Sequence, residues 1–229
     1  MTLIKHNILS TGSKGNAVII NDYILIDCGV PFRMLEPYYS RFKIVLLTHI
    51  HGDHFCKTTI GKLARERPTL RFACCRWLVN PLIECGVAKQ NIDILDFDIM
   101  YGYGLFNIIP VFLKHNVPNC GYKIHFAKEG KLFYATDCND LNGITAKGYD
   151  LYMVEANYVD EEIQEKIKQK RADGIYAYEQ QVIKNHLSKD KCDDWLYKNM
   201  SSNSQYIYLH CHYDDDEEQQ QNQGAKFSP

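Results

Sequence analysis

The segment from Thr48 to His54 carries the residues best suited to do chemistry. It reads Thr-His-Ile-His-Gly-Asp-His and places three imidazoles and one carboxylate within six residues. These two groups are the usual protein ligands for Zn²⁺ and similar divalent ions. In an extended turn His49 and His51 can point the same way, while Asp53 and His54 reach onward to a second position. The spacing suits two adjacent metals better than one, and the alternative is a surface loop that is merely rich in histidine.

Three further candidate ligands are scattered along the rest of the chain. They are His115, Asp137 and His210. Each stands just after an apolar run that reads as a strand, as His49 does after 43–47. If these strands lie side by side in a sheet, their ends bring the four residues together. Taken alone, His115 reads equally as a structural histidine and Asp137 as a turn aspartate.

The elements that must position these residues alternate between strands and helices along the chain, which predicts an α/β fold. We expect strands over 3–9, 17–20, 23–26, 43–47, 70–73, 92–95, 104–113, 122–126, 131–134, 151–154 and 206–209. We expect helices over 31–38, 55–67, 77–85, 160–171, 178–185 and 189–199.

Several local signals refine this assignment. Pro110 indicates an edge position or a bulge, because proline cannot donate to a sheet ladder. Asp160 and Ser188 are the expected caps of two helices. The cluster 116–121 is predicted to form a turn. The Gly-rich segment 10–16 can cradle a phosphate through its backbone N–H groups, but it lacks a P-loop pattern and reads better as a plain turn.

The composition is that of an ordinary globular protein, with 229 residues, 45% of them hydrophobic and 24% charged. The net charge of −2 gives no global sign of nucleic-acid binding, although a local basic patch is compatible with it. No apolar run approaches the ~20 residues of a membrane span, and 1–10 does not read as a signal peptide. We expect one domain over 1–213 and a disordered acidic, Gln-rich tail over 214–229. The composition leaves the oligomeric state open.

The cysteines indicate a reducing environment. There are nine of them, an odd number, and no C-x-x-C pair is present. Mostly buried thiols in a cytoplasmic protein are therefore expected.

Taken together, these residues resemble the metallo-β-lactamase fold superfamily, whose signature is H-x-H-x-D-H followed by single His, Asp and His residues. The match runs from His49 to His54 and then through His115, Asp137 and His210. It spans nearly the whole chain and implies an αββα sandwich of two mixed β-sheets flanked by helices.

The residues around these ligands are similar to one branch of that superfamily. His115-Asn-Val-Pro-Asn-Cys-Gly-Tyr122 and Tyr134-Ala-Thr-Asp137 resemble segments of the ribonuclease Z and YycJ-type nucleases. Val154-Glu-Ala-Asn157 and Asn185-His-Leu-Ser188 resemble the E-x-N and H-L-S segments of the YycJ-type proteins. The β-lactamase branch proper lacks the bridging Asp, so antibiotic hydrolysis is not favoured. The long arm with which ribonuclease Z grips tRNA has no counterpart visible here.

The resemblance implies a role for each matching residue. One metal is held by His49, His51 and His115. The second is held by Asp53, His54 and His210, and Asp137 bridges the two. Asp53 also orients the bridging hydroxide, and His186 contacts the scissile phosphate or protonates the leaving oxygen. His212 is a rival of His210 as the last ligand, and His210 is preferred.

The function indicated by the resemblance is hydrolysis of phosphodiester bonds by attack of a metal-bridging hydroxide, as in a nuclease. Two divalent ions are expected, with Zn²⁺ favoured and Mn²⁺ as the alternative. The expected partner is nucleic acid or a small phosphodiester. The alternatives are a metal-dependent hydrolase of a small ester, thioester, lactone or cyclic nucleotide, and an inactive metal-binding scaffold. The basic group from Lys166 to Arg171 suits a polyanion, although it also reads as a solvated helix face.

Overall fold

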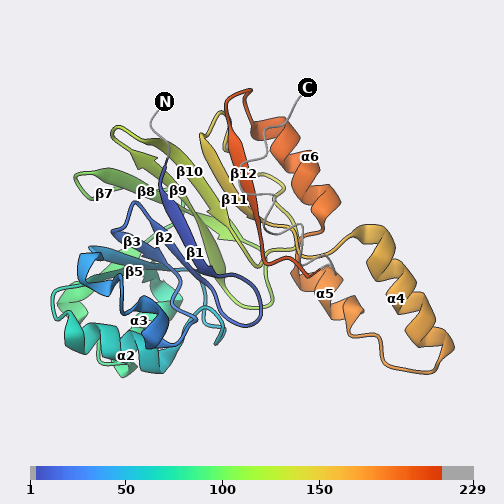
Figure 1. Cartoon of the computed structure of the whole chain (residues 1–229), viewed down its shortest axis with the longest axis horizontal. Helices are drawn as coiled ribbons and strands as arrows, with labels where there is room; N and C mark the ends of the chain where they lie inside the picture. Colours follow the sequence, from blue (N-terminus) through green and yellow to red (C-terminus); the bar gives the residue numbers. More distant parts are fainter. Residues whose placement is uncertain (1–3, 213–229) are drawn as a thin grey trace. The chain divides into compact units, whose positions relative to one another are not determined.

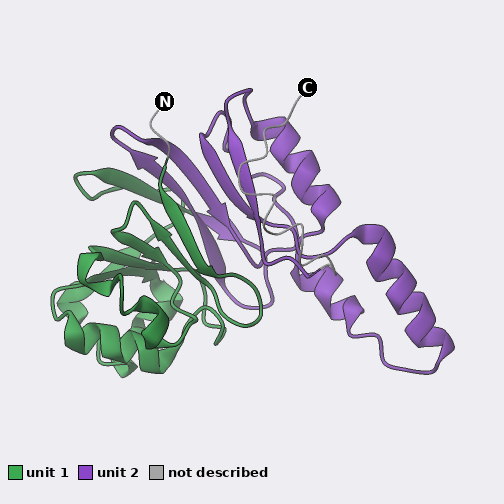
Figure 2. Cartoon of the chain, in the orientation of Figure 1, with its two compact units in different colours: residues 1–110 green, residues 111–229 purple. Residues whose placement is uncertain are grey.

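The structure is a computed structural model that describes residues 4–212. The chain divides into two compact units, residues 1–110 and residues 111–229, drawn in different colours in Figure 2. The predicted tail over 214–229 lies outside the described residues.

The first unit is built on a six-stranded mixed β-sheet whose strands follow one another in chain order. The strands are β1 (His6–Ser10), β2 (Ala17–Ile20), β3 (Ile24–Ile26), β4 (Ile44–Leu47), β5 (Arg71–Cys75) and β6 (Ile92–Leu95). The first three pair antiparallel, and β3 to β6 run parallel. Strands β2, β3 and β4 are buried throughout, as their apolar sequences predict.

Helices cover this sheet with apolar side chains. They are α1 (Phe32–Leu35), α2 (Lys57–Glu66) and α3 (Val79–Glu84), with single 3-10 turns at Tyr39–Arg41, Arg76–Leu78 and Lys89–Asn91. Ile60 and Leu63 of α2 join Val45 and Phe72 in one core, and fully burying each such side chain stabilises the fold by about 1.5–3 kcal/mol. Helix α1 is shorter than the predicted 31–38 because Pro37 has no N–H to continue it.

A second six-stranded mixed sheet has the order β12-β11-β10-β9-β8-β7. Its strands are β7 (Tyr101–Gly102), β8 (Phe106–Leu113), β9 (Asn119–Phe126), β10 (Gly130–Ala135), β11 (Leu151–Glu155) and β12 (Gln205–Leu209). Strands β9 and β10 form the predicted hairpin, while β10, β11 and β12 are parallel. The boundary between the two units falls inside β8, after Pro110.

Three helices belong to the second unit: α4 (Asp160–Ala172), α5 (Glu179–Asn185) and α6 (Lys189–Asn199). Helix α6 packs against β11, where Trp195 and Leu196 join the core of Phe133, Tyr152 and Val154. Helices α4 and α5 form a hairpin that extends away from the strands of this unit (Figure 1). The two mixed sheets with helices confirm the predicted α/β class.

The prediction for Pro110 holds locally, and that for the turn 116–121 is corrected. Strand β8 has neighbours on both sides, but its pairing with β7 ends at Ile108, so Pro110 lies at a locally unpaired edge and costs no ladder bond. Strand β9 begins inside the predicted turn 116–121 because Gly121 allows close backbone approach; a Cβ there would lie 2.5 Å from the Tyr134 carbonyl oxygen.

Of the two predicted helix caps, one is confirmed and one is wrong. Ser188 caps α6, and its hydroxyl accepts from the Lys191 N–H, as predicted. Asp160 is not the cap of α4. Val159 holds that position, and the Asp160 carboxylate accepts from the Ser188 hydroxyl at 3.0 Å.

All nine cysteines are free, and most are buried. Within the described part of the chain, every helix is too short or too polar to cross a bilayer.

Candidate metal centre

The candidate ligands stand at strand ends, as predicted. His49, His115 and Asp137 each lie two residues past the end of β4, β8 and β10, and His210 directly follows β12. Asp137 and His210 have positive φ values of 54° and 53°. Non-glycine residues rarely adopt this left-handed conformation, and such strain concentrates at functional sites.

In the first unit, Asp27 organises the histidine loop that follows β4. Its carboxylate is fully buried and accepts from both the N–H and the hydroxyl of Thr48, each at 2.9 Å. Its other oxygen lies 2.7 Å from His54 Nδ1. Asp27 itself has a φ of 59°. One buried carboxylate just after β3 therefore fixes both ends of the loop.

These contacts determine which ring nitrogens carry protons. Because the Thr48 hydroxyl donates to Asp27, the His49 Nδ1–H donates to the Thr48 oxygen, 3.0 Å away. Because His54 Nδ1–H donates to Asp27, the Nε2 of His54 keeps its lone pair. Both Nε2 atoms are therefore unprotonated, the form that binds a metal, and the His54 Nε2 accepts from the side-chain amide of Asn16 at 2.8 Å.

Close backbone packing holds the loop in place from the other side. The Asn16 N–H donates to the Asp53 carbonyl at 2.6 Å, and the Cys28 N–H donates to the His54 carbonyl at 2.9 Å. A Cβ added to Gly29 would lie 1.7 Å from the Asp53 carbonyl oxygen. Only glycine fits here, so the Gly-rich segment 10–16 and Gly29 serve to seat the histidine loop. Segment 10–16 forms a plain turn, which was preferred from the sequence over a phosphate cradle.

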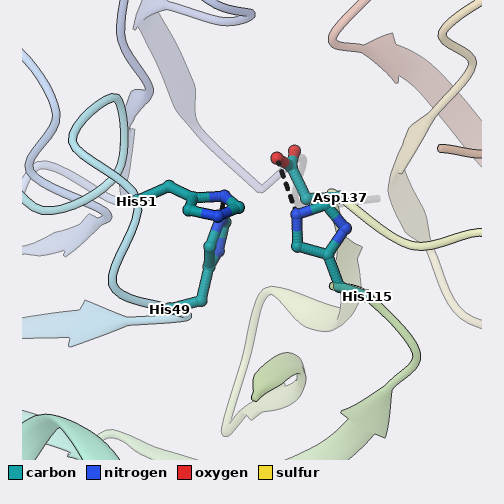
Figure 3. Close-up of side chains that lie close together, drawn as sticks. All are labelled: His49, His51, His115 and Asp137. Carbon is teal, nitrogen blue, oxygen red and sulfur yellow. Dashed lines mark hydrogen bonds and ion pairs between the residues drawn. The ribbon is translucent and has the colours of Figure 1, made fainter. Parts of the chain in front are cut away.

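The loop arranges its donors in two pairs. His49 Nε2 lies 3.1 Å from His51 Nδ1, and the two rings meet edge to face (Figure 3). Two nitrogens on one tetrahedral Zn²⁺ are about 3.3 Å apart for Zn–N bonds of about 2.05 Å. The second pair is Asp53 Oδ2 and His54 Nε2, 3.7 Å apart. The prediction of two positions within this heptapeptide is consistent with these distances.

In the second unit, Asp137 is surrounded by imidazoles and is 2% exposed. Its Oδ1 lies 2.7 Å from His210 Nδ1 and accepts from the Thr136 hydroxyl at 2.9 Å. Its Oδ2 lies 3.8 Å from His115 Nε2, a contact that Figure 3 marks with a dashed line. His115 Nδ1–H donates to the Asn185 carbonyl at 2.9 Å, so Nε2 faces the carboxylate with its lone pair.

The chemistry of these donors fits a cation. In two places an unprotonated ring nitrogen faces a carboxylate oxygen at 3.7–3.8 Å: His54 Nε2 with Asp53 Oδ2, and His115 Nε2 with Asp137 Oδ2. Two acceptors do not stabilise each other, but a divalent ion held by both does. Asp137, Glu155, His186 and His210 form a further group whose ligand atoms all lie within 4.8 Å of one another.

The buried Glu155 pairs with the half-buried His186 beside Asp137. Glu155, at the end of β11, is fully buried, and its Oε1 lies 2.6 Å from His186 Nδ1. Its Oε2 accepts from the Cys138 N–H at 2.8 Å and from the Leu187 N–H at 3.4 Å. Burial raises the pKa of Glu155, whereas the hydrogen bond from His186 opposes the rise. The His186 ring is held with Nε2 as its outward nitrogen.

A family model for the beta-lactamase superfamily domain matches residues 22–182, more than half of the chain. The chain belongs to this superfamily. Three solved structures share its fold. The metallo-beta-lactamase fold protein YhfI from Bacillus subtilis has 17% identity and a TM-score of 0.72, over 96% of this chain and 91% of that one. The short form of human tRNase Z has 14% identity and a TM-score of 0.67, over 90% and 92%.

The third structure is a diphosphatase of the PhnP family, with 14% identity and a TM-score of 0.64, over 97% of this chain and 96% of that one. No curated protein sequence matches the chain. Membership confirms the resemblance inferred from the motif, and with it the metallo-β-lactamase fold of two mixed sheets flanked by helices.

Within this beta-lactamase superfamily chain, the two candidates for the last ligand are placed differently. His210 is 3% exposed and contacts Asp137. His212 is exposed, and its ring lies 5.1 Å from that of His210. Partial burial and the neighbouring His210 lower the pKa of His212. The preference for His210 as the last ligand stays a prediction.

The sequence analysis assigned no role to three residues of the site. Asp27 and Glu155 carry buried carboxylates at strand ends, the same signal that identified Asp137. Asn157 donates to the His210 carbonyl at 3.0 Å and accepts from the His212 N–H at 2.9 Å. The position of Asn157 in the E-x-N segment is the sequence signal that could have identified it.

Proposed function

We propose that this chain is a dinuclear metal-dependent hydrolase of phosphodiester bonds that acts as a nuclease. The observation that carries the proposal is the buried Asp137 with His210 on one oxygen, beside a Glu155–His186 pair. A carboxylate in this setting suits a bridge between two metals, and the adjacent pair supplies a proton donor for a leaving oxygen. The fold neighbours named as tRNase Z and as a diphosphatase support phosphate chemistry.

The proposed metal ligands are the residues that match the family signature. One metal takes His49, His51 and His115, the second takes Asp53, His54 and His210, and Asp137 contributes to both. The donor set is rich in imidazole, which favours Zn²⁺, while Mn²⁺ is the alternative. When bound, a pair of divalent ions lowers the pKa of a water molecule and neutralises charge on the attacked phosphate.

His186 is the proposed general acid. The Glu155 carboxylate accepts from its Nδ1, which stabilises the imidazolium and leaves Nε2–H to be donated. As the P–O bond breaks, the Nε2 proton passes to the leaving oxygen. Because Oε2 of Glu155 is fixed by two backbone N–H groups, the pair cannot swing away.

Asp53 is the second proposed catalytic residue. The backbone of Asp53 is fixed by Asn16, while its side chain is 24% exposed. Its carboxylate therefore reaches the solvent side of the loop, where it orients the attacking water. The proposed substrate is a nucleic acid or a small phosphodiester, and the proposed location is the cytoplasm.

The proposal is tested by assaying metal-loaded protein on bis(p-nitrophenyl) phosphate, on labelled single- and double-stranded DNA and RNA, and on thioester and lactone substrates. We expect metal-dependent turnover of the phosphodiesters that is abolished by chelator and restored by Zn²⁺ or Mn²⁺. Turnover confined to the thioesters or lactones would contradict the proposal.

A further inference from the structure

The segment between α4 and α5, residues 173–178, exposes large apolar side chains at one point; we call it the tip. Ile175, Tyr176 and Tyr178 are 57%, 70% and 63% exposed. Ala177 between them is buried in the core of the hairpin. Large apolar groups gathered on a surface indicate an interaction site, since folding alone would not leave them in water.

The backbone of the tip has a defined conformation. Helix α4 ends in a Schellman motif, in which Gly174 has a φ of +68° and its N–H donates to the Arg171 carbonyl. The Ile175 N–H donates to the Lys170 carbonyl at 2.8 Å. The Lys170 ammonium lies 2.5 Å from the Glu179 carboxylate, which ties α4 to α5 beside the tip. These contacts fix the backbone from which the exposed side chains project.

The hairpin behind the tip has an apolar core of its own. Tyr158, Ile163 and Ile167 pack together with Ala177, and Val182 of α5 packs against them. The tip is therefore carried by a helical hairpin with its own apolar core, which Figure 1 shows extending from the second unit.

Charge on this end of the hairpin is positive. From 166 to 179 the chain has four cations (Lys166, Lys168, Lys170 and Arg171) against two anions (Asp173 and Glu179), a net of +2. The acidic residues of α4 lie in its first turns instead. This separation complements the helix dipole, but the dipole does not account for exposed tyrosines beside the cations. Cations next to exposed aromatic rings are the combination that binds single-stranded nucleic acid.

Helix α5 joins the tip directly to the proposed general acid. It spans seven residues and ends at His186, so it is about 10 Å long at about 1.5 Å per residue. A strand of about three stacked nucleotides covers that length at roughly 3.4 Å each.

We propose that the tip binds the bases of a single-stranded nucleic acid by stacking on Tyr176 and Tyr178, with the phosphates near the basic end of the hairpin. This inference rests on the proposed function, and it specifies that the substrate is a single strand extending about three nucleotides from the cleaved bond. Duplex bases are already stacked on each other and offer the tyrosines no free face.

The test is fluorescence anisotropy of a labelled 12-nucleotide single strand, as DNA and as RNA, with a matched duplex and with chelator present to prevent turnover. The full chain is compared with a Tyr176→Ala/Tyr178→Ala double variant. Tyr197→Ala on α6 is the matched control, since Tyr197 is 79% exposed and lies outside the hairpin. We expect the double variant to bind the single strand at least about tenfold more weakly, the control to bind normally, and the duplex to bind weakly to all three.

A second readout separates this inference from the proposed function. Hydrolysis of bis(p-nitrophenyl) phosphate, which has no base strand to hold, should be unchanged in the double variant. A wild-type protein that binds the single strand through the tip but never hydrolyses this ester supports the tip and contradicts the proposed function.

An unchanged affinity in the double variant overturns the inference, as does an equal loss in Tyr197→Ala. Two further outcomes also overturn it by assigning another occupant. One is binding to phosphatidylserine-containing vesicles that requires the two tyrosines while nucleic-acid binding does not. The other is self-association by sedimentation that the double variant abolishes while its nucleic-acid affinity stays the same.

Discussion

The two units position their candidate metal ligands in opposite ways. In the first unit, four candidate ligands come from one loop of six residues, and backbone contacts and Asp27 hold that loop. In the second unit, each candidate comes from a different strand end, and the side chains hold one another: His210 with Asp137, and His186 with Glu155. The first group is set by local geometry, whereas the second exists only when the sheet has formed.

This difference predicts where a single substitution does most damage. Substituting one residue of the second group should disturb the side chains that it contacts. Such substitutions should therefore lower catalytic turnover most. Losing a support of the loop should mainly weaken metal binding and stability.

The largest effect is expected from Asp137→Ala. Its removal takes away the proposed bridging carboxylate and the partner of His210, so turnover of bis(p-nitrophenyl) phosphate should fall by about 10³-fold or more. Circular dichroism should show an intact fold. Asp140→Ala is the matched control, because Asp140 contacts Lys114 at the surface and should be nearly neutral. Retained activity in Asp137→Ala would remove its bridging role.

A smaller loss is expected from His186→Ala and Glu155→Gln. A positioned general acid contributes about 10²–10⁴-fold, so His186→Ala should lower turnover within that range. Glu155→Gln keeps the shape but loses the charge that stabilises the imidazolium, and about a tenfold loss is expected. Metal content, measured by elemental mass spectrometry, should be unchanged in His186→Ala. If that variant loses metal, His186 is a ligand instead of an acid.

Asp27→Asn tests the support of the histidine loop. The amide cannot accept from both Thr48 and His54 as the carboxylate does, so metal affinity should fall by about 10–100-fold. Competition with a chelating dye measures the change. Asp22→Asn is a surface control, since Asp22 pairs only with exposed Lys5 and Arg41 among the described residues. An affinity equal to wild type would show that the loop is held without Asp27.

Gly29→Ala tests the close approach behind the same loop. The added Cβ would overlap the Asp53 carbonyl, and overpacking of this kind costs about 1–3 kcal/mol. The melting temperature should fall by about 3–10 °C for a chain of this size. Gly52→Ala is the control in the same loop, because its Cβ would meet nothing within 4 Å. Equal melting temperatures for the two variants would refute the packing argument.

The same contrast explains what could be predicted from the sequence. The loop from His49 to His54 was recognisable because its ligands are contiguous, and the strands were recognisable because their apolar runs are short and bounded. The single residues His115, Asp137 and His210 became meaningful only through the family pattern. Asp27 was not singled out and Glu155 was noted only as part of the E-x-N segment, because a buried carboxylate at a strand end looks like any turn residue until its partners are brought to it. Pro110 correctly indicated an edge position, because the neighbouring strand β7 is only two residues long and its pairing ends before Pro110.

The account depends most directly on the number of metal ions. Elemental analysis of metal-loaded, dialysed protein should give close to two divalent ions per chain, one for each set of three ligands joined by Asp137. A value near one would leave Asp137 nothing to bridge, and a value near zero from metal-replete protein would contradict the proposed mechanism outright.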